Sequence, residues 1–254
     1  MEYTHKPVLL DACIQALNIR PDGIYVDGTL GRAGHSREIA GRLTTGRLIC
    51  IDRDQAAIDA AQDRLAPWLD RVTLIHSNFS ELKEVLSRCG VSGADGMLFD
   101  LGVSSPQLDD ASRGFSYMQD APLDMRMDTS APLSAADIVN TWSQEELRRI
   151  LWQYGEERYS GPIAAAIVRA REQAPIQTTG QLADLIRGMG AHVNLIPINP
   201  VDGSPYSATD AANVQRFQKK LESLGVNATV RRRLGSEISA ACGQLRRDEM
   251  NGKA

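Results

Sequence analysis

Short apolar runs alternate with amphipathic stretches through the first hundred residues of the chain. The apolar runs predict strands at residues 24–27, 48–51, 72–76 and 96–101, and the stretches around them predict helices at 9–17, 36–43, 54–65 and 79–89. Strands that alternate with helices are typical of a parallel sheet with helices on its faces. The pattern therefore predicts an α/β fold for this part of the chain.

The pattern changes after the fourth predicted strand. Residues 102–129 are rich in Ser, Pro, Asp and Gly, as in a long functional loop. From 134 to 189 the periodicity is helical, with N-cap spacings at Ser134 and Ser143 and another short helix expected from Thr179. We therefore expect three segments, at 1–108, 109–189 and 190–254.

A glycine-rich turn follows the first predicted strand. Gly28, Gly31 and Gly34 stand between that strand and the next helix, and the second strand ends on Asp52. Such glycines let the backbone approach a ligand, and an acid at this distance can accept hydrogen bonds from ribose hydroxyls. Because no Lys-Ser or Lys-Thr pair follows, an adenosine ligand without a polyphosphate fits better, and S-adenosylmethionine is the common one. The alternative is an ordinary turn, since glycine-rich turns are frequent in α/β folds.

Composition limits the classes of protein to which the chain can belong. A hydrophobic fraction of 43% and a charged fraction of 24% are typical of a globular protein. The four cysteines have no C-x-x-C spacing, which disfavours metal clusters and disulfides and suits a cytoplasmic location. Without a leader-like start or a long apolar run we expect neither export nor a membrane span. The net charge of -4 argues weakly against bulk nucleic-acid binding, although cations cluster late in the chain, as a solvated surface or a binding patch (Lys219, Lys220, Arg231 to Arg233, Arg246 and Arg247).

Several polar motifs then follow in one order. They are HKPVLL, IRPDGIYVDGTLGRAGHS, DLGVSSPQLD at 100–109, RGFS at 113–116, DMRMD at 124–128 and YGEER at 154–158. Together they resemble the bacterial 16S ribosomal RNA cytosine-N4 methyltransferases over about residues 3–187. The resemblance implies a class I S-adenosylmethionine-dependent methyltransferase with a Rossmann-like parallel sheet, a helical insertion after the fourth strand for RNA recognition, and 16S ribosomal RNA or the small ribosomal subunit as partner.

The same resemblance implies the site residues. By matching positions, the cofactor contacts fall on Ala33, Gly34, His35, Asp52, Phe79, Asp100 and Gln107. Position 33 is Ala where the family more usually has Gly, which leaves backbone contacts possible. For His35 a backbone-level contact is favoured over a role as general base, since the amine needs only a weak acceptor after methyl transfer.

Candidates for the chemistry follow the fourth strand. Ser105 and the carbonyls beside Pro106 are placed to hold the exocyclic amine of cytosine, although a Pro-containing turn alone would explain this string. Asp124 and Arg126 could orient the substrate, or could form an ion pair at the surface worth less than ~1 kcal/mol. We expect no metal.

The last segment departs from this family. HVNLIPINP, VNATVRRR and SAACGQL resemble the C-terminal end of the radical S-adenosylmethionine 23S ribosomal RNA adenine-C2 methyltransferases, in which the cysteine at the place of Cys242 is catalytic. The cluster motif C-x-x-x-C-x-x-C is absent, so Cys242 is expected to be chemically idle. The chain is interpreted as a fusion or chimera with a seam near 187–191. Its methyltransferase sheet would be truncated. Its tail would be βαβα-like, with predicted elements at 193–196, 211–224, 228–232 and 236–245.

Two alternatives to an active cytosine methyltransferase stay open. One is a catalytically impaired remnant that binds cofactor or RNA without turnover. The other is a fragment of the radical enzyme that needs a separate cluster-bearing chain. Oligomeric state is not predicted.

Overall fold

The computed structural model describes residues 7, 9–187, 192–195, 211–223 and 227–230. The chain divides into two units. The first comprises residues 1–52, 56–100 and 190–254, and the second comprises residues 53–55 and 101–189. The predicted segment boundary after residue 108 falls inside the second unit.

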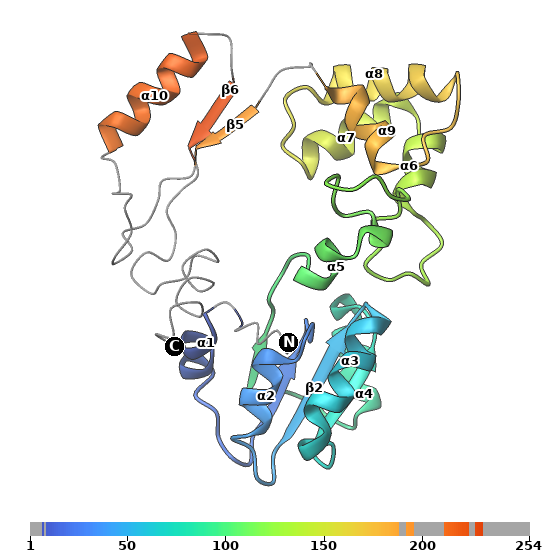
Figure 1. Ribbon diagram of the computed structural model, residues 1–254. Helices are drawn as coiled ribbons and strands as arrows, with labels where there is room; N and C mark the ends of the chain where they lie inside the picture. Colours follow the sequence, from blue (N-terminus) through green and yellow to red (C-terminus); the bar gives the residue numbers. More distant parts are fainter. Residues whose placement is uncertain (1–6, 8, 188–191, 196–210, 224–226, 231–254) are drawn as a thin grey trace. The chain divides into compact units, whose positions relative to one another are not determined.

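The first unit contains a four-stranded parallel sheet (Figure 1). Its order is β3-β2-β1-β4, with bounds β1 Ile24–Asp27, β2 Arg47–Asp52, β3 Val72–His76 and β4 Gly96–Leu98. Val26 of β1 lies opposite Ile49 of β2 and Met97 of β4. The chain order reverses between β1 and β4, and ligands of such sheets bind at the carboxyl ends of the strands beside this point. The predicted parallel α/β fold is confirmed.

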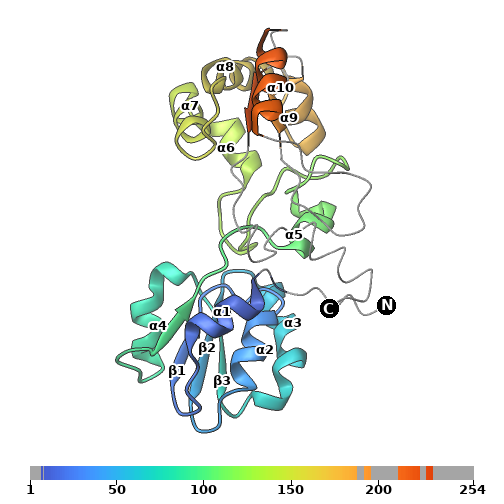
Figure 2. The ribbon, with the colours of Figure 1, turned by 90° about the vertical axis from the view of Figure 1, so that its left-hand side faces the viewer.

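Helices cover both faces of the sheet because the strand residues alternate. Tyr25, Leu48 and Cys50 share a core with α1 (Leu10–Leu17), α2 (Gly34–Ala40) and α3 (Gln55–Leu65). Val26 and Ile49 point the other way, into a core with α4 (Leu82–Arg88). Figure 2 shows these two helical layers on either side of the strands. Alternate side chains of a strand point to opposite faces, so both faces are apolar.

Element bounds in the first hundred residues differ from the sequence prediction most clearly at three elements. Helix α2 begins at Gly34 instead of 36, and the predicted helix 79–89 is a 3-10 turn, η2 (Phe79–Glu81), followed by α4. The predicted strand 96–101 was too long, since β4 ends at Leu98. Leu98 pairs with Asp27, the last residue of β1, and the chain turns at Gly28, so residues 99–101 have no strand beside them in the described sheet.

The second unit is largely helical. Its helices are α5 (Ser105–Asp109), the 3-10 turn η3 (Ala111–Arg113), α6 (Ala135–Thr141), α7 (Gln144–Gln153), α8 (Ser160–Arg171) and α9 (Thr179–Ile186). Ser134 and Ser143 form the predicted capping boxes, and α9 begins at Thr179 as predicted. Leu123, Leu147 and Ile167 are among the buried residues of its core. The two helical turns at 105–113 were missed within the predicted loop.

Residues after 190 form a strand-helix-strand segment. β5 (His192–Leu195) pairs in parallel with β6 (Asn227–Val230), and α10 (Ala211–Ser223) packs against β6. Three predicted tail elements are thereby confirmed. The predicted helix 236–245, with Cys242, lies outside the described residues. In the part of the chain that the structure describes, these strands form a sheet of their own and do not extend the four-stranded sheet.

Candidate cofactor site and substrate loop

The glycine-rich turn after β1 is hydrogen-bonded to the end of β2. The Gly31 N–H donates to Oδ2 of Asp52 at 2.8 Å, and the Leu30 N–H donates to the Ile51 carbonyl at 3.0 Å. A carboxylate that accepts from this turn lies at the carboxyl edge of the sheet, beside the ligand side of the fold. The structure therefore brings Asp52 and the 31–35 turn together, and their shared role as a cofactor site stays a prediction.

The turn depends on left-handed backbone at two positions. Gly31 has φ 49° and Ala33 has φ 59°. This conformation costs a residue with a Cβ about 1–2 kcal/mol, which explains physically why glycine is the usual residue at position 33. Ala33 is fully buried, and its N–H donates to the Leu30 carbonyl at 2.8 Å. The departure from glycine is thus accommodated with the turn intact.

A buried acid at the end of β1 stabilises the glycine-rich turn. Asp27 accepts from the Ser36 hydroxyl at 2.6 Å and from the Thr29 N–H at 3.1 Å. Burial raises the pKa of Asp27, and these two hydrogen bonds partly oppose the increase. Ser36 also contacts Cys50 Sγ at 3.2 Å, and burial raises the pKa of the Cys50 thiol well above its usual value. Sequence reasoning missed Asp27, although an acid at the end of an apolar strand is a visible signal.

Aromatic rings lie at the same edge of the sheet. Phe79 and Phe99 meet edge to face with ring centroids 5.7 Å apart, and both are about two-fifths exposed. A Cβ placed on Gly28 would lie 2.2 Å from the Phe99 ring, so only glycine allows this approach. The Asp100 N–H donates to the Thr29 hydroxyl at 2.6 Å. Phe99 was missed because the sequence placed it inside a strand.

The structure brings six predicted cofactor residues to the carboxyl-edge turns of the first unit: Ala33, Gly34, His35, Asp52, Phe79 and Asp100. Three observations fit an adenosine ligand. Backbone amides lie in a glycine turn, a half-buried carboxylate ends β2, and exposed aromatic rings lie nearby. His35 is buried beneath the turn, in keeping with a backbone-level contact. Their roles toward the cofactor stay predictions.

Gln107, the seventh predicted cofactor residue, belongs to the second unit. Its Nε2 donates to Asp54 Oδ2 at 2.8 Å, and its Oε1 accepts from the Ser104 N–H at 3.0 Å. Arg113 donates to the same Asp54 oxygen at 2.8 Å and to the carbonyls of Arg126 and Met127 at 3.0 and 2.9 Å. This network, which the sequence did not predict apart from Gln107, fixes the backbone of the predicted functional loop at 102–129.

The three predicted catalytic residues also lie in the second unit. Ser105 is the first residue of α5 and is half-buried, while Pro106 is exposed. Asp124 accepts from Arg126 Nε and Nη2 at 3.0 and 2.6 Å, and these side-chain hydrogen bonds lower the pKa of Asp124. Arg126 also donates to the Ala131 carbonyl at 2.7 Å. The geometry favours a loop-ordering role for Asp124, and its catalytic role stays a prediction.

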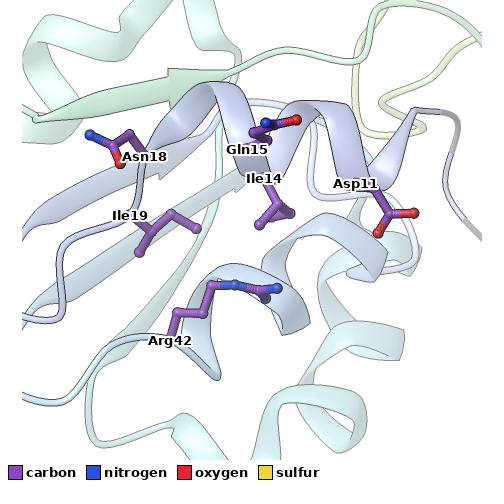
Figure 3. Close-up of a pocket in the computed structure, with 6 residues that line it drawn as sticks. All are labelled: Asp11, Ile14, Gln15, Asn18, Ile19 and Arg42. Atoms are coloured by element: carbon purple, nitrogen blue, oxygen red, sulfur yellow. The ribbon is translucent and has the colours of Figure 1, made fainter. Parts of the chain in front are cut away.

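A surface hollow elsewhere on the first unit contains none of these residues. It measures about 410 Å³ and is lined by α1 and its neighbours, including Ile14, Ile19 and Arg42 (Figure 3). No described helix is both long and apolar enough to cross a membrane. Among the described residues no group of three His, Cys, Asp or Glu is arranged to hold a metal ion. The turn and strand ends above therefore remain the candidate site.

The parallel sheet, the glycine turn and the acid at the end of β2 define an α/β protein of the class I methyltransferase type. Residues 2–201 match the MraW methylase family, and the chain belongs to that family. It is 59% identical over 188 residues to the ribosomal RNA small subunit methyltransferase H of Brevibacillus brevis, covering 74% of this chain and 60% of that protein. The proteins of the same name from a Paenibacillus species and Symbiobacterium thermophilum are 57% and 53% identical, covering 73% and 74% of this chain and 61% and 59% of theirs.

The chain thus spans about 60% of the length of the curated relatives that it matches. The family match continues through the predicted seam at 187–191 and ends at residue 201. From the sequence, residues 190–201 were assigned to the segment that resembles the radical enzyme. These residues instead lie within the match to the MraW methylase family. For residues 202–254 that resemblance stays a prediction.

Proposed function

We propose that this chain is an S-adenosylmethionine-dependent methyltransferase that acts on the N4 amine of a cytidine in 16S ribosomal RNA, in the cytoplasm. Membership of the MraW methylase family is the observation that carries the proposal. The relatives' printed name, ribosomal RNA small subunit methyltransferase H, supports the small subunit as partner. The Gly31–Asp52 contact supports the cofactor assignment.

In this proposal the first unit holds the cofactor, which supplies an electrophilic methyl group when bound. Asp52 accepts hydrogen bonds from the ribose, and the 31–35 turn offers backbone groups. Phe79 and Phe99 offer apolar contact to the adenine ring. Asp27 keeps the turn in place through Ser36 and Thr29.

The second unit presents the amine. Its lone pair is delocalised into the cytosine ring, so acceptors that hold its N–H groups help to orient it for an in-line displacement. Ser105 and the carbonyls beside Pro106 are the proposed acceptors. Arg113 and Asp124 act through the backbone that they fix, and His35 takes no proton. Methyl transfer to a base also requires an accessible nucleotide, so the substrate is single-stranded or locally flipped RNA.

A second candidate function follows from length. Because the chain spans about 60% of its relatives, a protein that binds cofactor or RNA without turnover is the alternative. A fragment of a radical enzyme is less favoured, since the sequence has four cysteines without the cluster spacing. For each of these three candidate functions, the fusion of the tail to the methyltransferase part is a separate proposal. It rests on the sequence of the tail alone.

The test is transfer of a tritiated methyl group to small and large ribosomal subunits from methylation-deficient cells, followed by nucleoside analysis. Label in N4-methylcytidine from the small subunit alone is expected. Cofactor binding without any labelled nucleoside would favour the non-catalytic alternative. Label in a methyladenine from the large subunit, obtained only after a cluster-bearing chain is added, would favour the radical fragment.

A further inference from the structure

Helix α10 has two sides of different character. Val214 and Gln218 are one helical turn apart and half-buried, and the helix packs against β6 (Figure 1). Arg216 and Lys220, also one turn apart, are exposed, and so is Lys219. The inward side is therefore occupied, while the outward side presents cations to solvent.

The stretch of α10 whose side chains the structure describes continuously, residues 212–220, is basic. Residues 212–220 contain Arg216, Lys219 and Lys220 and no Asp or Glu. Within the described residues, none of the three forms an ion pair, and Arg216 instead donates to the Asn213 side chain. Elsewhere some exposed cations are paired, for example Arg42 with Glu38 and Arg20 with Asp95. Unpaired cations on one short face make a local positive field despite the net charge of -4.

An aromatic side chain lies among these cations. Phe217 is 55% exposed, follows Arg216 directly and is three residues before Lys220. An exposed phenyl ring does not help to solvate a helix face, whereas burying the ring against a partner is favourable. An exposed ring beside cations suits nucleic acid, whose bases stack on aromatic faces while its phosphates meet the cations.

We propose that the outward side of α10, formed by Arg216, Phe217, Lys219 and Lys220, binds single-stranded RNA through its phosphates and one stacked base. The proposal deepens the proposed function by adding an RNA-binding surface at residues that lie outside the family match, which ends at 201. RNA is favoured over an anionic lipid surface because a helix that lies on a membrane needs a broad apolar face, and this side has a single exposed apolar ring.

The test measures binding of a fluorescein-labelled single-stranded RNA to the full chain, by anisotropy without cofactor and over a range of salt concentrations. Each phosphate contact contributes about -0.7 to the slope of log K against log salt, so Lys219→Gln/Lys220→Gln should reduce the slope by about 1.4. At about 0.1 M salt, one decade below a reference of about 1 M, this change in slope corresponds to an affinity about 25-fold lower. Phe217→Ala should weaken binding by roughly tenfold with the slope unchanged.

The matched control is Lys83→Gln/Arg88→Gln, which removes two exposed cations of α4 and should change affinity less than twofold. Equal losses in the two double variants would overturn the proposal, because binding would then depend on net charge alone. Vesicles containing phosphatidylserine that compete fully with the RNA would overturn it in favour of a lipid surface. Methyl transfer to the small subunit is measured separately. If methyl transfer fails while RNA binding is intact, the proposed function is refuted and the RNA-binding surface on α10 stands.

Discussion

Arg113→Met should strongly destabilise the second unit. The Arg113 and Asp54 side chains are only 13% and 7% exposed, and their charged atoms meet at 2.8 Å. Removing one partner of a buried pair leaves an uncompensated charge and costs about 3–5 kcal/mol. Two carbonyls, those of Arg126 and Met127, also lose a charged donor. We expect a loss of at least 3 kcal/mol in the free energy of unfolding.

The assay is urea unfolding followed by tryptophan fluorescence in a Trp68→Phe background. The chain has three tryptophans, and the other two, Trp142 and Trp152, lie in the second unit, so the signal reports on that unit. The matched control is Arg20→Met, which breaks an exposed ion pair with Asp95 and should cost less than ~1 kcal/mol.

A second variant distinguishes the charge from simple packing. Adding Asp54→Asn to Arg113→Met removes the stranded charge while Asn keeps an acceptor for Gln107, so part of the stability should return. The account of this network is refuted if Arg113→Met costs no more than the control, or if the added Asp54→Asn makes the loss larger.

The remaining predictions concern activity and pH. Ser105→Ala should lower turnover at least tenfold with little change in cofactor affinity; an equal loss of both would mean that Ser105 shapes the cofactor site instead. Because Arg126 lowers the pKa of Asp124, the stability contributed by that carboxylate is present above the unfolded pKa of about 4 and is lost as pH falls through the folded pKa. Asp124→Asn should therefore flatten the urea-midpoint profile between about pH 5 and 3, and an unchanged profile would contradict this. Cys242→Ala should leave methylation within about threefold of the parent, since a lone cysteine is usually a packing residue; a methylated Cys242 in the mass spectrum would reverse this prediction.

The sheet was predictable because its strands are buried on both faces. Continuous apolar runs such as 48–51 identify β2 whatever its neighbours are, and capping boxes mark the starts of α6 and α7. The end of β4 was not predictable in the same way. It depends on where the neighbouring strand β1 turns, which is a tertiary fact that local propensity does not contain.

The proximity of candidate site residues was predictable where sequence motifs mark them, and it was not predictable where only long-range contacts join them. Asp52 and the 31–35 turn follow from spacing, and the structure joins them through the Gly31 N–H. Arg113 and Asp54 are 59 residues apart, and nothing local marks them as partners. Phe99 was hidden in the overlong strand. Long-range hydrogen bonds and ring contacts of this kind need the fold itself.

The measurement that tests the central claim most directly is calorimetric titration of S-adenosylmethionine into the parent chain, Asp52→Ala and Asp63→Ala. Asp63 is an exposed acid of α3 and serves as the matched control. Hydrogen bonds to a charged acceptor are worth about 1.5–3 kcal/mol each, so Asp52→Ala should weaken binding at least tenfold. Asp63→Ala should bind like the parent. Absence of binding by the parent, or equal affinity of the folded Asp52→Ala variant, would contradict the account.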